Sequence, residues 1–523
     1  SLDNVDITSI TSKRNQTSIT NLDADFSAAD IIADQRQDYD FDTFSQEIRI
    51  SSKNVDSNLD WMLGAYYQQE DINTFRNVTY GTQTYTYSDT LVTLGLSQAI
   101  AAAAIEGYLA AGLPPAGAQA FAEQQVAAAL GPVGGSGLAY VGAAFGVCFV
   151  NGVACTDVFY IPGTGMPSSV WSMDNTAMSV FGQMDYQISD SLTATLGLAY
   201  SDDSKDVSGD ITIIDAFAAL PLEAAGLGAL SGLQFFPAFR NYPNADENGK
   251  FDSDDVTHTL SLSYAMSDST SIYMTHSSGF KATSVNMTVD ARDVRAADPE
   301  DATNIEIGLK TTFDNGYLNL AFFDQNIEGF QSNAFSGTGF NLVNAGKESH
   351  KGVELDSMLA LSENLMLRVS AMSLDAVYDS FEKGTCDTTG LAEPQYQCPA
   401  GQPYVDLSGL NPAGIHDLSA NANIVYSFNL GGVLDGFARL EYVYEEDTNL
   451  ADLIPVSIAE RGFKNVNASV GFNADNWSVM FWGRNITDHE TLYSAFPTTA
   501  APGSFSGYPS APSTYGVTFK MNL

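Results

Sequence analysis

The segment VTHTLSLSYAM at residues 256–266 alternates between large, mostly apolar side chains and small, mostly polar ones. A period of two residues is typical of a β-strand that buries one face and wets the other. The same alternation returns in segments 192–200, 466–473 and 515–523. The chain is therefore predicted to be all-β, with strands from one end to the other.

Alternation alone does not separate a soluble sandwich from a transmembrane barrel, and three other features do. The polar face is built from Ser, Thr, Asn and Gly, and only 16% of all residues are charged, against roughly 25% in soluble domains. Several apolar runs also end in aromatic residues, as the girdles of a barrel require. These aromatic groups are Trp61 with Tyr66 and Tyr67, and Trp477 with Phe481 and Trp482.

The third feature is the rhythm of the connections, which alternate between short and long. Short turns are predicted at 53–60, 189–191, 267–269, 314–316, 362–364, 429–435 and 474–476. Long connections are predicted at about 76–172, 208–252, 282–301, 379–414 and 488–512. Outer-membrane barrels have short periplasmic turns and long extracellular loops. We therefore predict one antiparallel transmembrane β-barrel over residues 1–523, with about 16 strands and a periplasmic C-terminus.

The longest connection, 76–172, is too long for an ordinary linker. Its Ala-rich part, Leu96 to Leu130, is predicted to form two short helices broken at Pro114 and Pro115. Leu94–Leu113 is the most apolar stretch, but Ser97, Gln98 and Glu106 interrupt it, so a loop helix is favoured over a membrane-spanning one. Such helices could gate ligand entry, shield the surface or contact a neighbour.

The charge and the cysteines narrow the class further. A net charge of −41 excludes a general nucleic-acid binder, which needs a basic face. The four cysteines form two local pairs, Cys148/Cys155 and Cys386/Cys398. Disulfides in an oxidising compartment are predicted, and zinc is the weaker alternative because no histidine lies beside either pair.

The segment LQFFPAFRNY at 233–242 is apolar although it lies in a loop. Exposed apolar surface often marks a binding site. Ligand contact is therefore predicted for Phe235, Phe236, Phe239, Arg240 and Tyr242. A loop packed on itself is an equally weighted alternative.

A calcium loop is suggested by Asn244, Asp246, Asn248, Gly249 and Asp255, with Gly at the sixth position. Asn replaces the usual first acid, and Asp replaces the bidentate Glu at the end, which weakens the match. An acidic turn with Asn-Gly at its tip is the favoured alternative. Ca²⁺ is the one cofactor that the sequence suggests.

No catalytic arrangement is found in the sequence. The five histidines (His258, His276, His350, His416 and His489) are assigned to five separate strands or strand ends. Phosphate-binding loops, G-x-S-x-G elbows and H-E-x-x-H motifs are missing from the sequence. The protein is predicted not to be an enzyme.

Several segments together resemble the TonB-dependent receptors of the outer membrane of Gram-negative bacteria. The segments that carry the resemblance are ITSITSKR (7–14), FDTFSQEIRISS (41–52), LDWMLGAYYQQE (59–70), SSGFKA (277–282), DPEDATNIEIGLK (298–310), NAGKESHKGVELD (344–356), NWSVMFWGRNITD (476–488) and PSTYGVTFKMNL (512–523). The final residue, Leu523, departs from the Phe with which the family usually ends. The order and spacing of the segments carry the resemblance over nearly the whole chain.

The resemblance implies TonB-dependent uptake of a scarce nutrient, such as a siderophore, a cobalamin or an oligosaccharide. Expected partners are outer-membrane lipid, including lipopolysaccharide, a small-molecule or oligosaccharide ligand, and TonB through a segment not in this chain. The family's N-terminal plug is not recognised in the sequence, so about 16 strands of a 22-stranded barrel are expected here. A passive sixteen-stranded porin and a structural or adhesive surface barrel are the alternatives.

Overall fold

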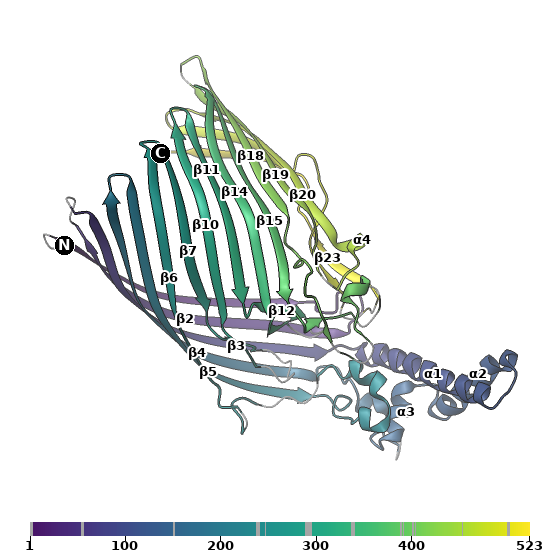
Figure 1. The fold of residues 1–523 in the computed structure, drawn as a ribbon. Helices are drawn as coiled ribbons and strands as arrows, with labels where there is room; N and C mark the ends of the chain where they lie inside the picture. Colours follow the sequence, from purple (N-terminus) through teal and green to yellow (C-terminus); the bar gives the residue numbers. More distant parts are fainter. Residues whose placement is uncertain are drawn as a thin grey trace.

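The computed structural model describes residues 4–522 apart from 54–56, 150–151, 237–240, 246, 288–294, 336–339, 388–389, 391, 400–401, 403, 433, 452, 499–500 and 502. Sixteen strands form one antiparallel sheet, and neighbours in the sheet follow one another along the chain (Figure 1). The predicted strand number is confirmed. The strands are β1 (Val5–Leu22), β2 (Ile32–Ser52), β3 (Leu59–Tyr80), β4 (Gly165–Ser189), β5 (Leu192–Ile214), β6 (Lys250–Ser267), β7 (Thr270–Lys281), β10 (Glu300–Phe313), β11 (Gly316–Glu328), β14 (Lys347–Ser362), β15 (Leu365–Ser380), β18 (Leu418–Leu430), β19 (Leu434–Asn449), β20 (Glu460–Asn473), β21 (Trp477–Arg484) and β24 (Thr514–Met521).

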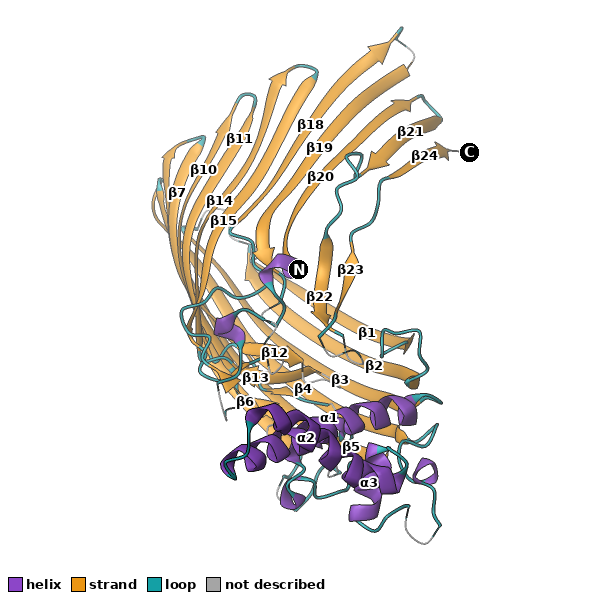
Figure 2. Cartoon of the chain, turned by 90° about the vertical axis from the view of Figure 1, so that its right-hand side faces the viewer, coloured by secondary structure: helices purple, strands orange, loops and turns teal. Residues whose placement is uncertain are grey.

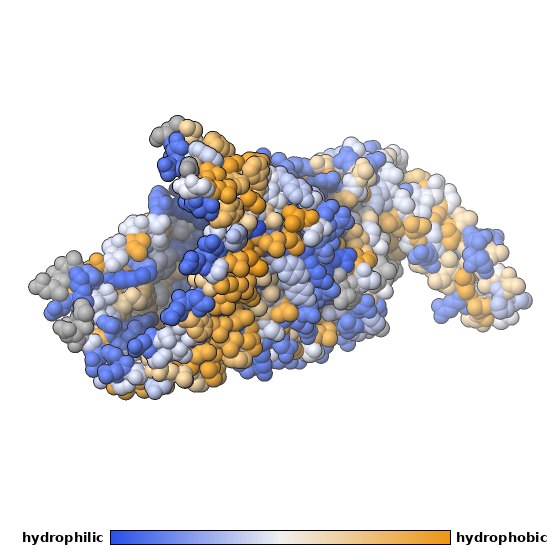
Figure 3. Space-filling view, turned by 90° about the horizontal axis from the view of Figure 1, so that it is seen from above, coloured by the Kyte–Doolittle hydropathy of each residue, from blue (hydrophilic) through white to orange (hydrophobic). Residues whose placement is uncertain are grey.

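The outer face of this sheet is apolar and exposed. On β6, Val256, Leu260 and Leu262 are 58%, 49% and 52% exposed, while the inward-facing residues between them are small and polar. Exposure of large apolar side chains along whole strands fits a lipid-facing wall. Figure 3 shows apolar residues gathered over the strands, with hydrophilic residues on either side.

Some of the residues predicted for the aromatic girdle face the inside of the sheet, and for these residues the prediction is wrong. Leu63 is 58% exposed on the outer face of β3, so the alternation of side chains places Tyr67 outward and Tyr66 inward. Phe481 is 51% exposed on the outer face of β21, whereas Trp482 faces inward and its Nε1 donates to Thr518 Oγ1 at 3.2 Å. Adjacent aromatic residues on a strand cannot share one face, and that is why each group is split.

The connections alternate between the two ends of the sheet, as predicted. At the turn end, the strands are joined through 53–58, 190–191, 268–269, 314–315, 363–364, 431–433 and 474–476. At the loop end, the five predicted long connections span 81–164, 215–249, 282–299, 381–417 and 485–513. Three further connections, 23–31, 329–346 and 450–459, were not predicted. The connection 329–346 contains two short strands of its own, so its sequence does not look like a loop. Both chain ends lie at the turn end (Figure 1).

Small hairpins lie within the long connections at the loop end. They pair β8 (Ser284–Val285) with β9 (Ala296–Ala297), β12 (Gln331–Phe335) with β13 (Phe340–Asn344), β16 (Gly384–Thr385) with β17 (Tyr404–Val405), and β22 (Leu492–Pro497) with β23 (Phe505–Pro509). The large sheet curves as a barrel wall does (Figure 2). Its edge strands are β1 and β24, and no ladder joins them among the described residues.

Helices occur in the connection 81–164, as predicted. They are α1 (Thr84–Ala110), α2 (Ala118–Leu130) and α3 (Gly137–Ala144), while α4 (Val456–Ala459) lies in a later loop. Short 3₁₀ segments are η1 (Pro115–Gly117), η2 (Gly131–Val133), η3 (Cys155–Asp157), η4 (Glu223–Ala225), η5 (Gly228–Leu233) and η6 (Pro394–Tyr396).

The break at Pro114 and Pro115 is confirmed, but the first helix is longer than predicted. α1 has 27 residues and begins at Thr84 rather than near Leu96. Residues 84–95 are rich in Thr and Tyr, which favour helix only weakly. Their helix is held by packing, because Ser88, Val92 and Leu96 form a buried row at a spacing of four residues. By length and composition alone α1 could cross a membrane, although only 11% of its most apolar window is buried.

A row of aspartates crosses four strands on the outer face, on the loop side of the apolar band. Asp42 pairs directly with Asp71, Asp71 with Asp174, and Asp174 with Asp206. All four are exposed. Lys250 Nζ lies 2.7 Å from Asp206, and the described residues give the other three no salt bridge. Like charges directly opposite one another destabilise a sheet.

Replacing Asp71 with asparagine is expected to stabilise the sheet by about 0.2–1 kcal/mol at low salt, because Asp71 is repelled by Asp42 and Asp174 on both sides. The gain should shrink in concentrated salt, which screens exposed charges. Guanidinium unfolding of the protein in detergent measures it. Asn73→Asp, which adds a charge on the same face of β3, is the control and should destabilise the sheet.

Candidate functional site

Two long connections fold together at the loop end of β3, β4 and β5. We call this unit, residues 81–164 and 215–249 with the adjoining strand ends, the loop body. Its core contains fully buried Trp171, Phe159 and Phe217. Phe159 and Phe217 meet edge to face, with ring centroids 5.4 Å apart. The loop body is thus a packed unit with its own apolar core.

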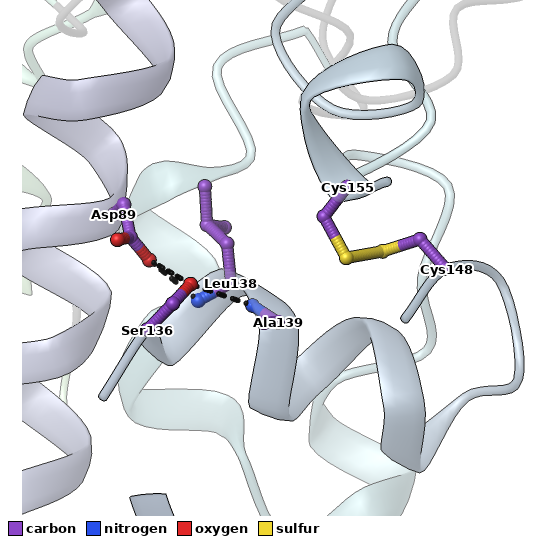
Figure 4. The surroundings of a disulfide bond; sticks show 6 residues. All are labelled: Asp89, Ser136, Leu138, Ala139, Cys148 and Cys155. Atoms are coloured by element: carbon purple, nitrogen blue, oxygen red, sulfur yellow. Dashed lines mark hydrogen bonds between the residues drawn. A yellow bond between two sulfur atoms is a disulfide. The ribbon is translucent and has the colours of Figure 1, made fainter. Parts of the chain in front are cut away.

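Specific polar contacts and a disulfide fix α3 in the loop body (Figure 4). Ser136 is the N-cap of α3, and its Oγ accepts a hydrogen bond from Ala139 N at 3.0 Å. Asp89 of α1 accepts from Ser136 Oγ at 2.7 Å and from Leu138 N at 2.8 Å. Capping of this kind satisfies donors that the first helical turn leaves free.

Both predicted disulfides are confirmed. Cys148–Cys155 has an S–S distance of 2.02 Å and lies in the core of the loop body. Cys386–Cys398 closes the loop 381–417 with an S–S distance of 1.96 Å. That loop packs Tyr396 and Leu407 against Tyr378 at the end of β15.

The predicted ligand segment lies largely inside the loop body. Phe236 and Tyr242 are only 3% and 5% exposed. Phe235 is half-buried, with its ring 6.3 Å from Tyr80 and 5.8 Å from Tyr160. Phe239 and Arg240 lie outside the described residues. Burial of these rings supports the alternative of internal packing, and ligand contact by this segment stays a prediction.

The residues of the predicted calcium loop are engaged elsewhere. Asn244 Oδ1 accepts from Glu247 N at 3.2 Å, and Asn248 Oδ1 accepts from Lys250 N at 3.0 Å. Asp255 lies inside β6 and pairs with Ser201 of β5. Asp246 lies outside the described residues. Within the described part of the chain, no group of three or more His, Cys, Asp and Glu side chains could hold a metal. Calcium binding therefore remains untested, and the favoured alternative of an acidic turn fits the contacts.

A buried carboxylate links the loop body to β3. Asp215 is 9% exposed, and its Oδ2 accepts from Tyr80 Oη at 2.5 Å. Its Oδ1 accepts from the backbone N–H groups of Phe217 and Ala218, both at 3.0 Å. Burial raises the pKa of the Asp215 carboxyl above its ordinary value of 3.8, and the hydrogen bonds oppose that rise.

The stability of the loop body should fall as the pH rises above 3.8, because the folded state holds the Asp215 proton more tightly than the unfolded state does. Asp215→Asn, which keeps a carbonyl acceptor for the two N–H groups, should remove that part of the pH dependence. It should leave the loop body at least as stable at neutral pH. Protection of the loops from protease between pH 4 and pH 8 measures this, and an unchanged pH profile would contradict it.

The inner wall of the sheet carries several carboxylates that line two cavities. A cavity of about 510 Å³ is lined by residues of β7, β10, β11, β14, β15, β18 and β19, including Glu306, Glu354 and Asp356. Tyr273 Oη donates to Glu306 Oε1 at 2.6 Å, and Lys310 Nζ lies 5.1 Å from the Tyr273 ring. Glu306 and Glu354 also line a second cavity of about 510 Å³.

A histidine–carboxylate pair adjoins the second cavity. His350 lines it, and His350 Nε2 lies 2.7 Å from Oε1 of Glu348, which is 1% exposed. None of these inner-wall residues was predicted from the sequence as a site residue. A signal was present, since Glu306 and Glu354 occupy the polar positions of the alternating segments NIEIGLK and KGVELD.

A family model described as TonB dependent receptor-like, beta-barrel matches residues 3–486. The chain belongs to the TonB-dependent receptors. Family membership accounts for the mostly-β fold, and it does not favour the porin alternative. TonB-dependent receptor barrels reside in the outer membrane of Gram-negative bacteria, and the family is one of receptors rather than enzymes.

Solved structures resemble this chain over nearly its full length. The ferric yersiniabactin uptake receptor FyuA from Yersinia pestis aligns with a TM-score of 0.65 at 12% identity, covering 100% of this chain and 60% of that one. The siderophore receptor PiuA from Acinetobacter baumannii aligns with a TM-score of 0.58 at 13% identity, covering 99% of this chain and 62% of that one. The copper transporter OprC aligns with a TM-score of 0.58 at 10% identity, covering 99% of this chain and 63% of that one. The chain thus spans about three-fifths of these proteins.

The five histidines of this TonB-dependent receptor lie on or beside separate strands, and two of them meet across neighbouring strands. His258 of β6 and His276 of β7 lie on the outer face, with 2.9 Å between Nε2 and Nδ1. Ser278 Oγ lies 3.0 Å from His258 Nδ1. The register of β6 against β7 brings them together, and a single sequence does not reveal that register. Both ring nitrogens of His258 are thus within hydrogen-bond distance of a polar partner at the lipid-facing wall.

Proposed function

We propose that this chain is the barrel of a receptor that imports a scarce nutrient across the outer membrane with energy supplied through TonB. The family-model match over residues 3–486 carries the proposal. The elaborate loop end supports it, because ligand selection needs varied surface loops on a rigid scaffold. The ligand class remains a siderophore, a cobalamin or an oligosaccharide, as the resemblance implies.

In this proposal the loop end is extracellular and the turn end, with both chain ends, is periplasmic. Short turns face the periplasm and long loops face outward in outer-membrane barrels. Lipid and lipopolysaccharide would contact the outer face, and TonB would act through a segment outside this chain. The inner wall with Glu306 and Glu354 would line the path that the plug closes.

The proposal includes further strands that close the wall between β1 and β24. Unpaired sheet edges are not stable in hydrocarbon, and both edges are unpaired among the described residues. A sixteen-stranded porin would instead pair β1 with β24. Transporters with a plugged lumen have 22 strands, so six would be supplied from outside this chain.

Transport by the full-length protein in cells tests the proposal. Uptake of a panel of radiolabelled ferric siderophores, cobalamin and oligosaccharides is compared in cells with and without TonB. At least one compound should accumulate only when TonB is present. A steady open channel from the full-length protein in a planar bilayer, with TonB-independent uptake, would contradict the proposal and favour a porin.

A further inference from the structure

The outer half of α1 and nearly all of α2 form a helical arm that packs on the loop body only at its base, through Ile100 and Val126. We define the arm as residues 97–129, which run out along α1, turn at η1 and return along α2. Figure 1 shows it projecting from the loop end, beyond the strands. The buried row of α1 ends at Leu96, and within the arm only Ala118 and Ala122 are buried.

The two helices of the arm pack against each other along their facing sides. Tyr108 of α1 and Phe121 of α2 have ring centroids 5.2 Å apart. The remaining surface is rich in alanine and includes Leu109 and Leu113, which are 43% and 46% exposed. A helix of 13 residues such as α2 is marginal in water unless an apolar face is packed. The arm therefore presents an apolar surface that its own chain leaves uncovered.

The surroundings of the arm are nearly free of charge, in contrast to the rest of the molecule. Residues 90–156 contain two charged side chains, Glu106 and Glu123, although the chain as a whole carries 63 acidic and 22 basic residues. Helices that lie on membranes use Lys and Arg to hold anionic head groups, and this segment has neither. The absence of basic residues argues against a lipid surface as the occupant.

We infer that the arm is a self-association surface, on which the arm of a second copy packs to form a four-helix bundle. Two hairpins with exposed small and apolar side chains complete such a bundle by covering each other's open faces. A two-fold interface repeats the same patch on both copies. Elsewhere two copies repel through their acidic surfaces, so the weakly charged arm is where they approach.

The size of the arm sets the strength of the contact. Each helix of the arm is about 20 Å long, which places the interface near the small end of specific contacts. The pairing is therefore reversible, and confinement of both copies in one membrane raises their effective concentration. We therefore expect a dimer that forms in the outer membrane and dissociates on dilution in detergent.

Cross-linking of the full-length protein in isolated outer membranes tests the inference. Ala103 in the arm and Ala224 in the neighbouring loop are both exposed alanines, so Ala103→Cys and Ala224→Cys form a matched pair. Under mild oxidation Ala103→Cys should give about tenfold more disulfide-linked dimer than Ala224→Cys, in keeping with a contact worth one decade in affinity.

A second pair of variants separates packing from folding. Leu109→Glu, placed on the Ala103→Cys background, should lower the dimer yield about tenfold, because it puts unpaired carboxylates into the interface. Leu94→Glu is the control, since Leu94 is 54% exposed on the same helix outside the arm, and it should leave the yield unchanged. Circular dichroism verifies that each variant is folded.

Two outcomes would overturn the inference. One is equal dimer yields from the two cysteine variants, and the other is a cross-link from Ala103→Cys to a protein of different mass. The second result would assign the arm to another partner. Neither result bears on TonB-dependent uptake, which can fail or succeed independently of dimer formation.

Discussion

Trp171→Ala is expected to destabilise the loop body by about 3–5 kcal/mol, the usual loss for a large aromatic side chain in a packed core. Trp171 is 1% exposed at the loop end of β4. Its ring lies 6.3 Å from that of Tyr242 and 5.0 Å from the Arg295 guanidinium. Gly209 of β5 provides the space, because a Cβ there would lie 2.6 Å from the indole.

Several segments depend on this one side chain, and their protection is the measurement. Trp171 contacts the connections 215–249 and 282–299 through Tyr242 and Arg295. Hydrogen exchange should therefore rise in both connections and in α3, while the strands below stay protected. Trp61→Ala, on the lipid-facing side of β3 near the turn end, is the control and should leave the loops unchanged. Equal exchange in Trp171→Ala and the parent protein would show that the loop body does not depend on Trp171.

The strands could be predicted from the sequence because their signal is local. The alternation in 256–266 sets which side chains of β6 face lipid, and short polar stretches such as 268–269 set the turns. Register is not local. The approach of His258 to His276 depends on which residues of β6 and β7 pair with one another. A single sequence contains no record of that pairing.

The loops were harder to predict because tertiary packing overrides their composition. The apolar segment 233–242 resembled an exposed binding surface, yet Phe236 and Tyr242 are core residues of a unit built from two distant connections. α1 begins twelve residues before its predicted start because Val92 and Leu96 pack against α3 and η5. The proline break between α1 and α2 and the two short-range disulfides had local causes, and they were predicted correctly.

Substitutions at lipid-facing and inward-facing positions test directly whether the sheet spans a membrane. Leu262→Arg is expected to destabilise the protein by about 2–4 kcal/mol in a lipid bilayer, because it places a charge near the middle of the apolar band. Leu262 is 52% exposed on the outer face of β6 and is flanked by Ala194 and Met274. The neighbouring Ser263 faces inward, so Ser263→Arg adds the same charge to the water-filled side at little cost.

The comparison of these two variants is informative because they share strand, depth and substituted side chain. Guanidinium unfolding of the protein in lipid vesicles should separate them by about 2 kcal/mol or more. In a soluble sandwich the exposed Leu262 would be the tolerant position, and Ser263 on the inner face would be the sensitive one. A reversed order of stabilities would therefore refute the membrane-spanning wall itself, and the transport proposal would fall with it.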